Sequence, residues 1–228
     1  MGTTHIIRVA GFAVGIAILG AGCTPEPEPD LPPTVMDTPA LVWKDGIEPS
    51  SPLEADERVA AIRAAEVGVS MARNTGDFTI AQLTDHATRA RIEERVYMYR
   101  SQGADRNYDP GPAPFEPLAI VEELEDGGAL VEVCRPRLSF NWYYDETDSF
   151  DPTRGEVGPE PGGTFLARVV REDGKLKYDG DLIYSDEGWV EGRSCGEVPV
   201  PVGLFNPQPV IPEDPAAEPV RPPLFEEE

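Results

Sequence analysis

The residues of this sequence best suited to ligand binding are three aromatic side chains with two cations before them. Trp142, Tyr143 and Tyr144 belong to the densest aromatic run of the chain, and Arg135 and Arg137 precede it. Aromatic side chains beside a long loop are typical of the mouth of a ligand pocket. An edge strand whose aromatic face packs on the domain accounts for the same residues and is the more ordinary interpretation.

The sequence offers no obvious set of residues for catalysis. The chain has two histidines, His5 and His86, and His86 lies near the end of a predicted helix, where a surface or capping histidine is commoner than a catalytic base. No P-loop, dinucleotide fingerprint, nucleophile elbow or paired-cysteine zinc motif occurs. We therefore predict no catalytic residue and no cofactor.

Two acidic segments contain oxygen donors that could hold a cation. The acids of residues 145–151 lack the order of an EF-hand loop and its central glycine. Residues 179–181 read Asp-Gly-Asp, which is too short to enclose an ion. We interpret both segments as solvated acidic loops and predict no metal site.

The charge of the chain excludes one class of partner. Its 228 residues contain 42 Asp and Glu against 19 Lys and Arg, for a formal net charge of −23. Binding to a nucleic-acid backbone needs cations that replace counterions. We therefore predict no nucleic-acid partner.

The amino terminus is typical of a secretory signal peptide over residues 1–22. A weakly basic start is followed by an uncharged stretch over residues 9–22, shorter than the ~20 apolar residues of a membrane-spanning helix. Residues 19–23, Leu-Gly-Ala-Gly-Cys, resemble the lipobox of bacterial lipoproteins, although Gly20 stands where that family usually has an aliphatic residue. The resemblance implies that Cys23 is lipidated and becomes the first residue of a chain anchored on the extracytoplasmic face of the cell membrane. An ordinary secreted protein or an uncleaved anchor is the alternative.

The cysteine count agrees with this location. Lipidation of Cys23 would leave Cys134 and Cys195, which can form a single pair. An extracytoplasmic compartment permits a disulfide, and closing a loop of this length stabilises a fold by about 4 kcal/mol in the chain-entropy model. Two buried free thiols are the alternative.

Proline and acidic residues divide the chain into a domain and two tails. Residues 23–50 and 199–228 are rich in both, which favours a lipid-anchored linker and a disordered tail. Residues 51–198 are long enough to bury one core. We therefore predict a single domain over residues 51–198.

Within this domain, helices precede strands. A capping signal at Ser51 and a stop at residues 74–76 predict a long helix, with Arg63, Glu66, Ser70 and Arg73 on one stripe. A short helix over residues 79–86 and a third over residues 88–102 follow. From Pro117 the hydrophobic period changes to two, which predicts one hairpin about residues 126–128 and another about residues 173–174.

This α+β order resembles the nuclear transport factor 2-like superfamily, in which a curved antiparallel sheet forms a cone around an amino-terminal helix. More narrowly, residues 123–134 resemble actinobacterial lipoproteins that carry such a domain behind a proline-rich linker. The Arg-Pro-Arg at residues 135–137 departs from the acidic run that those relatives often have. The resemblance implies a pocket in the cone, used for catalysis by some members and not by others.

The sequence therefore predicts a membrane-anchored lipoprotein, not an enzyme, whose α+β domain binds a small molecule, a cell-envelope component or another protein. An isomerase or cyclase that uses an apolar pocket and a scaffold without a ligand are the alternatives.

Overall fold

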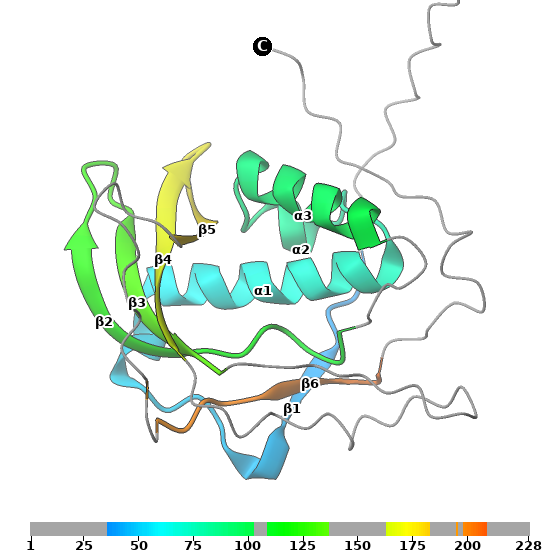
Figure 1. Cartoon of the computed structure of the whole chain (residues 1–228), viewed down its shortest axis with the longest axis horizontal. Helices are drawn as coiled ribbons and strands as arrows, with labels where there is room; N and C mark the ends of the chain where they lie inside the picture. Colours follow the sequence, from blue (N-terminus) through cyan, green and yellow to red (C-terminus); the bar gives the residue numbers. More distant parts are fainter. Residues whose placement is uncertain (1–35, 103–108, 137–162, 183–194, 196–197, 209–228) are drawn as a thin grey trace, which may run out of the picture. The chain divides into compact units, whose positions relative to one another are not determined.

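The computed structural model describes residues 36–102, 109–136, 163–182, 195 and 198–208, all within the compact unit Pro32–Glu228. The helices of these residues are η1 (Lys44–Gly46), η2 (Pro52–Ala55), α1 (Glu57–Thr75), α2 (Ala81–Thr84) and α3 (Arg89–Gln102). The strands are β1 (Ala40–Trp43), β2 (Glu116–Glu123), β3 (Ala129–Arg135), β4 (Gly163–Glu172), β5 (Lys175–Leu182) and β6 (Gly203–Asn206). Helices before an antiparallel sheet confirm the α+β class (Figure 1).

The long helix α1 starts later than the sequence predicts. The Ser51 signal opens the 3-10 helix η2 instead, where the Ser51 side chain accepts a hydrogen bond from the backbone N–H of Leu53. The side chain of Asp56 then caps α1, and Gly76, at a φ of 70°, ends it in the left-handed region. The predicted cap at Ser51 and the predicted stop at residues 74–76 are both present, but the cap belongs to η2 and the stop to α1.

The four-stranded sheet has the order β2–β3–β4–β5, with every neighbouring pair antiparallel. Val131 and Val133 on β3 and Ala167 and Val169 on β4 are fully buried in the core that also contains the apolar face of α1. Asp173 and Gly174 both have positive φ values in the turn between β4 and β5, as a tight hairpin of this kind requires. Both predicted hairpins are therefore confirmed.

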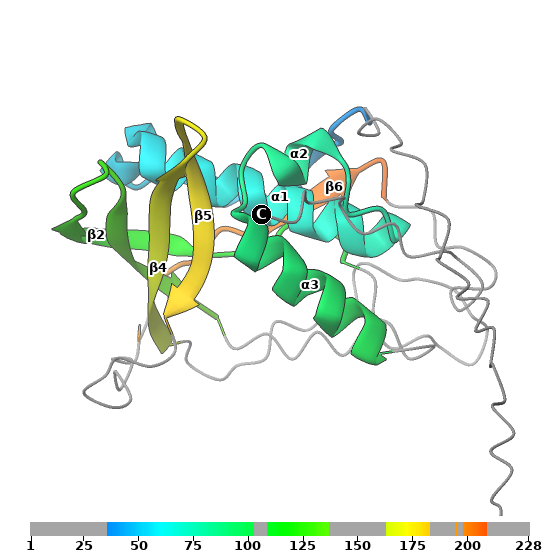
Figure 2. The same ribbon diagram turned by 90° about the horizontal axis from the view of Figure 1, so that it is seen from above.

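The α2–α3 junction joins the free edge of β5. Thr88 donates its backbone N–H to the carbonyl of Tyr178, and Tyr178 donates its own to the carbonyl of His86, at 3.1 and 2.8 Å. Ile92 and Val96 face the core from α3. Figure 2 shows the start of α3 beside β5, and Figure 1 shows α2 and α3 on the same side of α1. These contacts attach the start of α3 to β5.

The boundaries predicted for the linker and the tail are wrong within the described residues. β1 lies in the predicted linker 23–50 and β6 in the predicted tail 199–228, yet the two strands pair antiparallel, with Leu41 opposite Phe205. Phe205 is 2% exposed and donates its backbone N–H to the carbonyl of Pro110 at 2.7 Å. Short strands among prolines, about 160 residues apart, give no periodic signal, but their few apolar side chains still cover the core. We call this two-stranded sheet the strap.

The strap lies very close to the segment that follows α3. A β-carbon added at Gly111 would fall 1.9 Å from the carbonyl oxygen of Gly203 on β6, so a glycine is required at this position. Residues 109–115 therefore run between the strap and α1.

Cys134 and Cys195 form the predicted disulfide, with their Cα atoms 5.7 Å apart. The bond joins residue 195 to the end of β3, one residue before Arg135.

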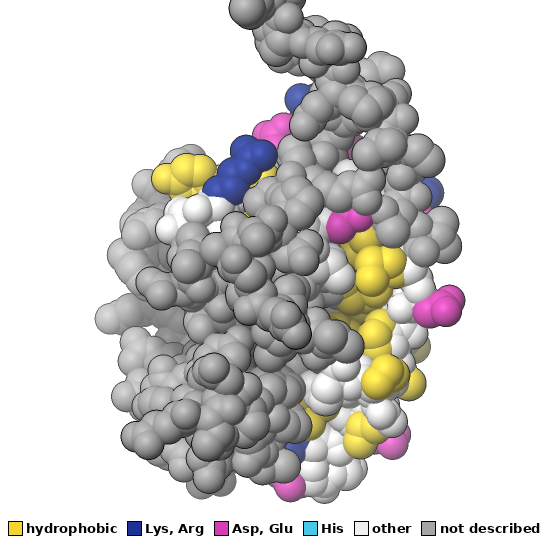
Figure 3. All heavy atoms as spheres, turned by 90° about the vertical axis from the view of Figure 1, so that its right-hand side faces the viewer, with side chains coloured by type: hydrophobic (Ala, Val, Ile, Leu, Met, Phe, Trp, Pro, Cys, Tyr) yellow, Lys and Arg dark blue, Asp and Glu magenta, His cyan; other side chains and the backbone are white. Residues whose placement is uncertain are grey.

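The surface of the described residues includes an apolar face. Figure 3 shows a face on which hydrophobic side chains form a strip with Asp and Glu side chains around it. Among the residues that the structure describes, no helix combines the length and the apolarity needed to cross a bilayer.

Candidate functional site

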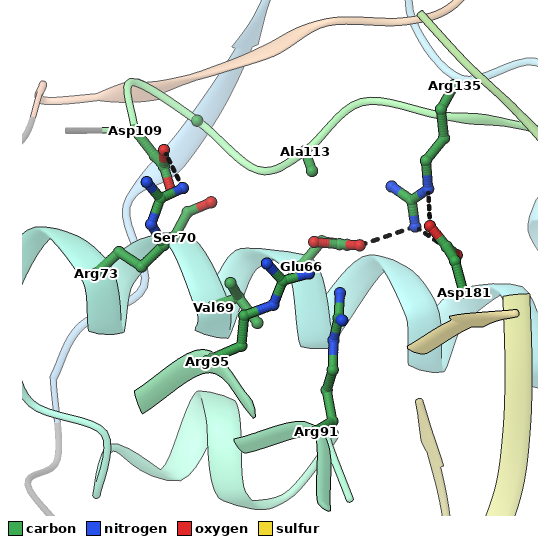
Figure 4. A pocket seen from close by; sticks show the side chains of 11 residues that line it. Glu66, Val69, Ser70, Arg73, Arg91, Arg95, Asp109, Ala113, Arg135 and Asp181 are labelled. Atoms are coloured by element: carbon green, nitrogen blue, oxygen red, sulfur yellow. Dashed lines mark hydrogen bonds and ion pairs between the residues drawn. The ribbon is translucent and has the colours of Figure 1, made fainter. Parts of the chain in front are cut away.

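A cavity of about 220 Å³ lies between α1, α3, β3, β5 and the segment after α3 (Figure 4). Charged side chains of both signs dominate its wall. The lining residues are Glu66, Val69, Ser70, Arg73, Arg91, Arg95, Asp109, Gly111, Ala113, Arg135 and Asp181.

The α1 wall of the cavity is the polar stripe that the sequence predicts. Glu66, Ser70 and Arg73 follow one another at helical spacings on the same face, and Glu66 and Ser70 are buried. Arg63, the first residue of the stripe, lies elsewhere: its guanidinium stacks 3.9 Å from the Phe115 ring centroid. It lines a second cavity of about 120 Å³ beside the strap.

At one end of the cavity, Arg135 joins two carboxylates. Its Nη2 lies 2.8 Å from Glu66 Oε1, and its Nε lies 2.7 Å from Asp181 Oδ2. The Tyr178 hydroxyl donates to Asp181 Oδ1 at 2.7 Å and accepts from Arg135 Nη2 at 2.9 Å. Burial alone would lower the pKa of Arg135, but the Glu66 and Asp181 carboxylates raise it above its ordinary value. This cation stays charged and is paired with two carboxylates of the protein.

At the other end, Arg73 Nη1 donates to both carboxylate oxygens of Asp109, at 2.8 and 2.9 Å. The Asn74 side chain holds the Asp109 backbone by two hydrogen bonds of 2.7 Å, one to its N–H and one to its carbonyl. Burial raises the pKa of Asp109 to about 6, although Arg73 opposes this shift. Asp109 is therefore fixed in place and titrates close to neutrality.

Between these ends, α3 directs Arg91 and Arg95 into the cavity from successive turns (Figure 4). The Nε atoms of both residues are buried without a hydrogen-bond partner. Arg91 is 6% exposed and bonds Glu94 at 2.7 Å through Nη1, whereas Arg95 has no hydrogen bond or ion pair within the described residues. Burial and the neighbouring Arg91 cation lower the pKa of Arg95. Of the two cations, Arg95 is thus the one that has no carboxylate bonded to it among the described residues.

Sequence reasoning missed this pair. Arg91 and Arg95 are four residues apart and directly precede Ile92 and Val96, which face the core. Residues four apart on a helix lie on the same side, so these two cations lie together beside the buried apolar stripe. This spacing was the signal that the sequence offered for the pair. What the sequence could not give is the segment from Asp109 to Ala113 that closes the cavity opposite them.

The structure places the predicted ligand-mouth residues only in part. Arg135 lines the cavity, whereas Arg137, Trp142, Tyr143 and Tyr144 lie outside the described residues. Cys23 and the acids of residues 145–151 also lie outside them.

The solvated interpretation of residues 179–181 is wrong, because both acids have partners within the fold. Asp181 pairs with Arg135, and Asp179 accepts a hydrogen bond of 2.6 Å from Thr88. The hairpin geometry of β4 and β5, which the short motif does not reveal, turns these carboxylates toward their partners. His86 is not among the residues that line the cavity, and burial lowers its pKa.

Across the described part of the chain, no group of three or more His, Cys, Asp or Glu residues is arranged to hold a metal ion. Comparisons with protein-family models, with curated proteins and with solved structures gave no match. The chemistry of the cavity therefore has to be inferred from its own residues.

The raised pKa of Asp109 predicts a pH-dependent stability. A carboxyl that binds its proton more tightly in the folded than in the unfolded state costs stability above pH 6, and this cost disappears as the pH falls from about 6 to about 4. The full difference is about 3 kcal/mol for a shift from 3.8 to about 6. Urea unfolding of wild type and Asp109→Asn at pH 7.5 and pH 4.5 measures it. Wild type should gain stability relative to the variant at the lower pH, and a difference that is the same at both pH values would contradict the assignment.

Proposed function

We propose that the chain is a lipid-anchored extracytoplasmic protein whose α+β domain binds a small molecule in the arginine-lined cavity. The observation that carries the proposal is the pair of Arg91, which is buried, and Arg95, which is half-buried, because the Nε atoms of both are buried in the cavity wall without a partner. Burying an unsatisfied charged donor costs free energy, and a bound ligand supplies the missing acceptors.

The location rests on the sequence. The predicted signal peptide over residues 1–22 and Cys23 at its end support anchoring to the outer side of the cell membrane. We also propose that the domain is a cone of the nuclear transport factor 2-like type, on the basis of its element order. The open cavity supports binding over a scaffold without a ligand.

Asp109 gives the enzyme alternative one observation in its favour, because a buried carboxyl with a pKa of about 6 resembles a general base. Both of its oxygens, however, accept hydrogen bonds from Arg73. A carboxylate held in this way favours a structural role in a binding site over proton abstraction, so binding is the better-supported function.

One experiment on the full chain tests both parts of the proposed function. The mature protein should sediment with membranes, and Cys23→Ala should release it or block its processing.

The solubilised protein should be stabilised against heat by at least one compound from a mixed set of neutral, cationic and anionic small molecules. Ala113→Trp, which fills the cavity, should lose that response. An unmodified amino terminus upstream of Cys23 would contradict the anchor, and a set without any stabilising compound would contradict the binding.

A further inference from the structure

We infer that the cavity binds a small organic monocarboxylate, whose carboxylate group lies between the guanidinium groups of Arg91 and Arg95. The inference rests on the proposed function and specifies the chemical class of its ligand.

The first reason is that the four arginines of the cavity differ in the partners that they already have. Arg73 is bonded to Asp109, and Arg135 is bonded to Glu66 and Asp181, so neither has a full set of donors left. Arg91 pairs only with the half-exposed Glu94 and Arg95 with no carboxylate of the described residues, and the two lie one helical turn apart on α3 with both Nε atoms buried and unpartnered. Guanidinium forks match the two oxygens of a carboxylate. The pair therefore forms the anion-binding part of the cavity.

The second reason is the charge of the whole cavity. Among the described residues that line the cavity, four guanidinium groups face three carboxylates, and Glu94, outside the lining, pairs with Arg91, so Arg95 is the cation left without a carboxylate of its own. A monoanion balances that charge, whereas a dianion such as phosphate would be repelled by Glu66, Asp109 and Asp181. Burial lowers the pKa of Arg95, and the neighbouring Arg91 cation lowers it further.

The third reason is the size and composition of the wall. About 220 Å³ is several times the ~30 Å³ that a water molecule occupies in the liquid, so a simple inorganic ion would leave most of the space empty. Val69 and Ala113 line the cavity together with the charged groups. An organic group attached to the carboxylate can contact these two side chains.

The test compares acids with their neutral amides. Thermal unfolding and isothermal titration are followed with sodium acetate, sodium lactate and sodium benzoate, with acetamide and benzamide, and with sodium phosphate, all at one ionic strength. At least one carboxylate should raise the melting temperature and give a saturable titration, because a ligand that binds only the folded state stabilises it. Its amide should have no effect, and phosphate should bind at least tenfold more weakly.

Two matched variants of α3 assign the effect to the cavity. Arg95→Gln should weaken carboxylate binding at least tenfold without loss of folding, because it removes a half-buried cation that has no hydrogen bond or ion pair within the described residues. Arg100→Gln removes the same charge from an exposed position on the same helix and should leave binding unchanged.

The possible outcomes separate this inference from the proposed function. Amides that bind as well as the acids, phosphate that binds as well as the monocarboxylates, or an Arg95→Gln variant with unchanged affinity would each overturn the inference and leave small-molecule binding standing. A protein that responds to none of the acids but to other compounds in the mixed set would overturn it as well. A protein that responds to no compound at all would overturn both.

Discussion

Replacement of Arg135 by methionine is expected to lower the free energy of unfolding by about 3–5 kcal/mol, the usual cost of removing one member of a buried ion pair. The reason is that Arg135 is the shared partner of Glu66 and Asp181, whose side chains are only 4% and 17% exposed. Methionine fills a similar volume but leaves both carboxylates without their cation. Denaturant unfolding of the disulfide-bonded protein measures the loss.

Arg168→Met is the matched control for this variant. Arg168 lies on the neighbouring strand β4, is 46% exposed and pairs with Asp179 at 3.2 Å. A surface pair of this kind contributes about 0–1 kcal/mol, so the control should be nearly as stable as wild type. Equal losses for the two variants would mean that the Arg135 cluster contributes no more than a surface pair.

The second large effect concerns the strap. Phe205→Ala is expected to destabilise the fold by about 3–5 kcal/mol, because it removes a side chain that is 2% exposed and belongs to the main core. Chemical unfolding gives the stability.

Val42→Ala is the control within the strap. Val42 lies on β1, opposite β6, and is 51% exposed, so its truncation should change stability by less than about 0.5 kcal/mol. If Phe205→Ala were as mild as this control, residues 199–208 would be an unpacked tail, as composition alone suggests.

The sequence predicts those parts of the fold whose signal is local. The third helix ends at Gln102 as expected, and the turns at residues 126–128 and 173–174 follow directly from Asp and Gly at the required positions. The disulfide follows from the parity of the cysteines once Cys23 is set apart. For the helix end and the turns, neighbouring residues carry enough information to decide, and for the disulfide the count of cysteines does.

The parts that the sequence does not predict depend on contacts between distant segments. The strap pairs residues 40–43 with residues 203–206, and proline-rich surroundings hide both strands. The cavity also depends on contacts between distant segments. The stripe of Glu66, Ser70 and Arg73 is visible in the sequence. Its neighbours in the cavity, Arg95 and Asp109, come from other segments. A polar stripe on a mostly apolar helix points to a buried site without revealing which side chains complete it.

The central claim is that Arg91 and Arg95 together hold a carboxylate, and the arginine side-chain resonances report on this directly. The measurement is a titration of the full, ¹⁵N-labelled mature chain with sodium benzoate, or with whichever of the three carboxylates binds best, followed by ¹H–¹⁵N spectra of the arginine Nε–H groups. Signals are assigned from their loss in Arg91→Gln and Arg95→Gln. We predict saturable changes that are largest at Arg91 and Arg95, with no change at the exposed Arg100. Saturable changes confined to other arginines, or equal changes at all of them, would contradict the claim.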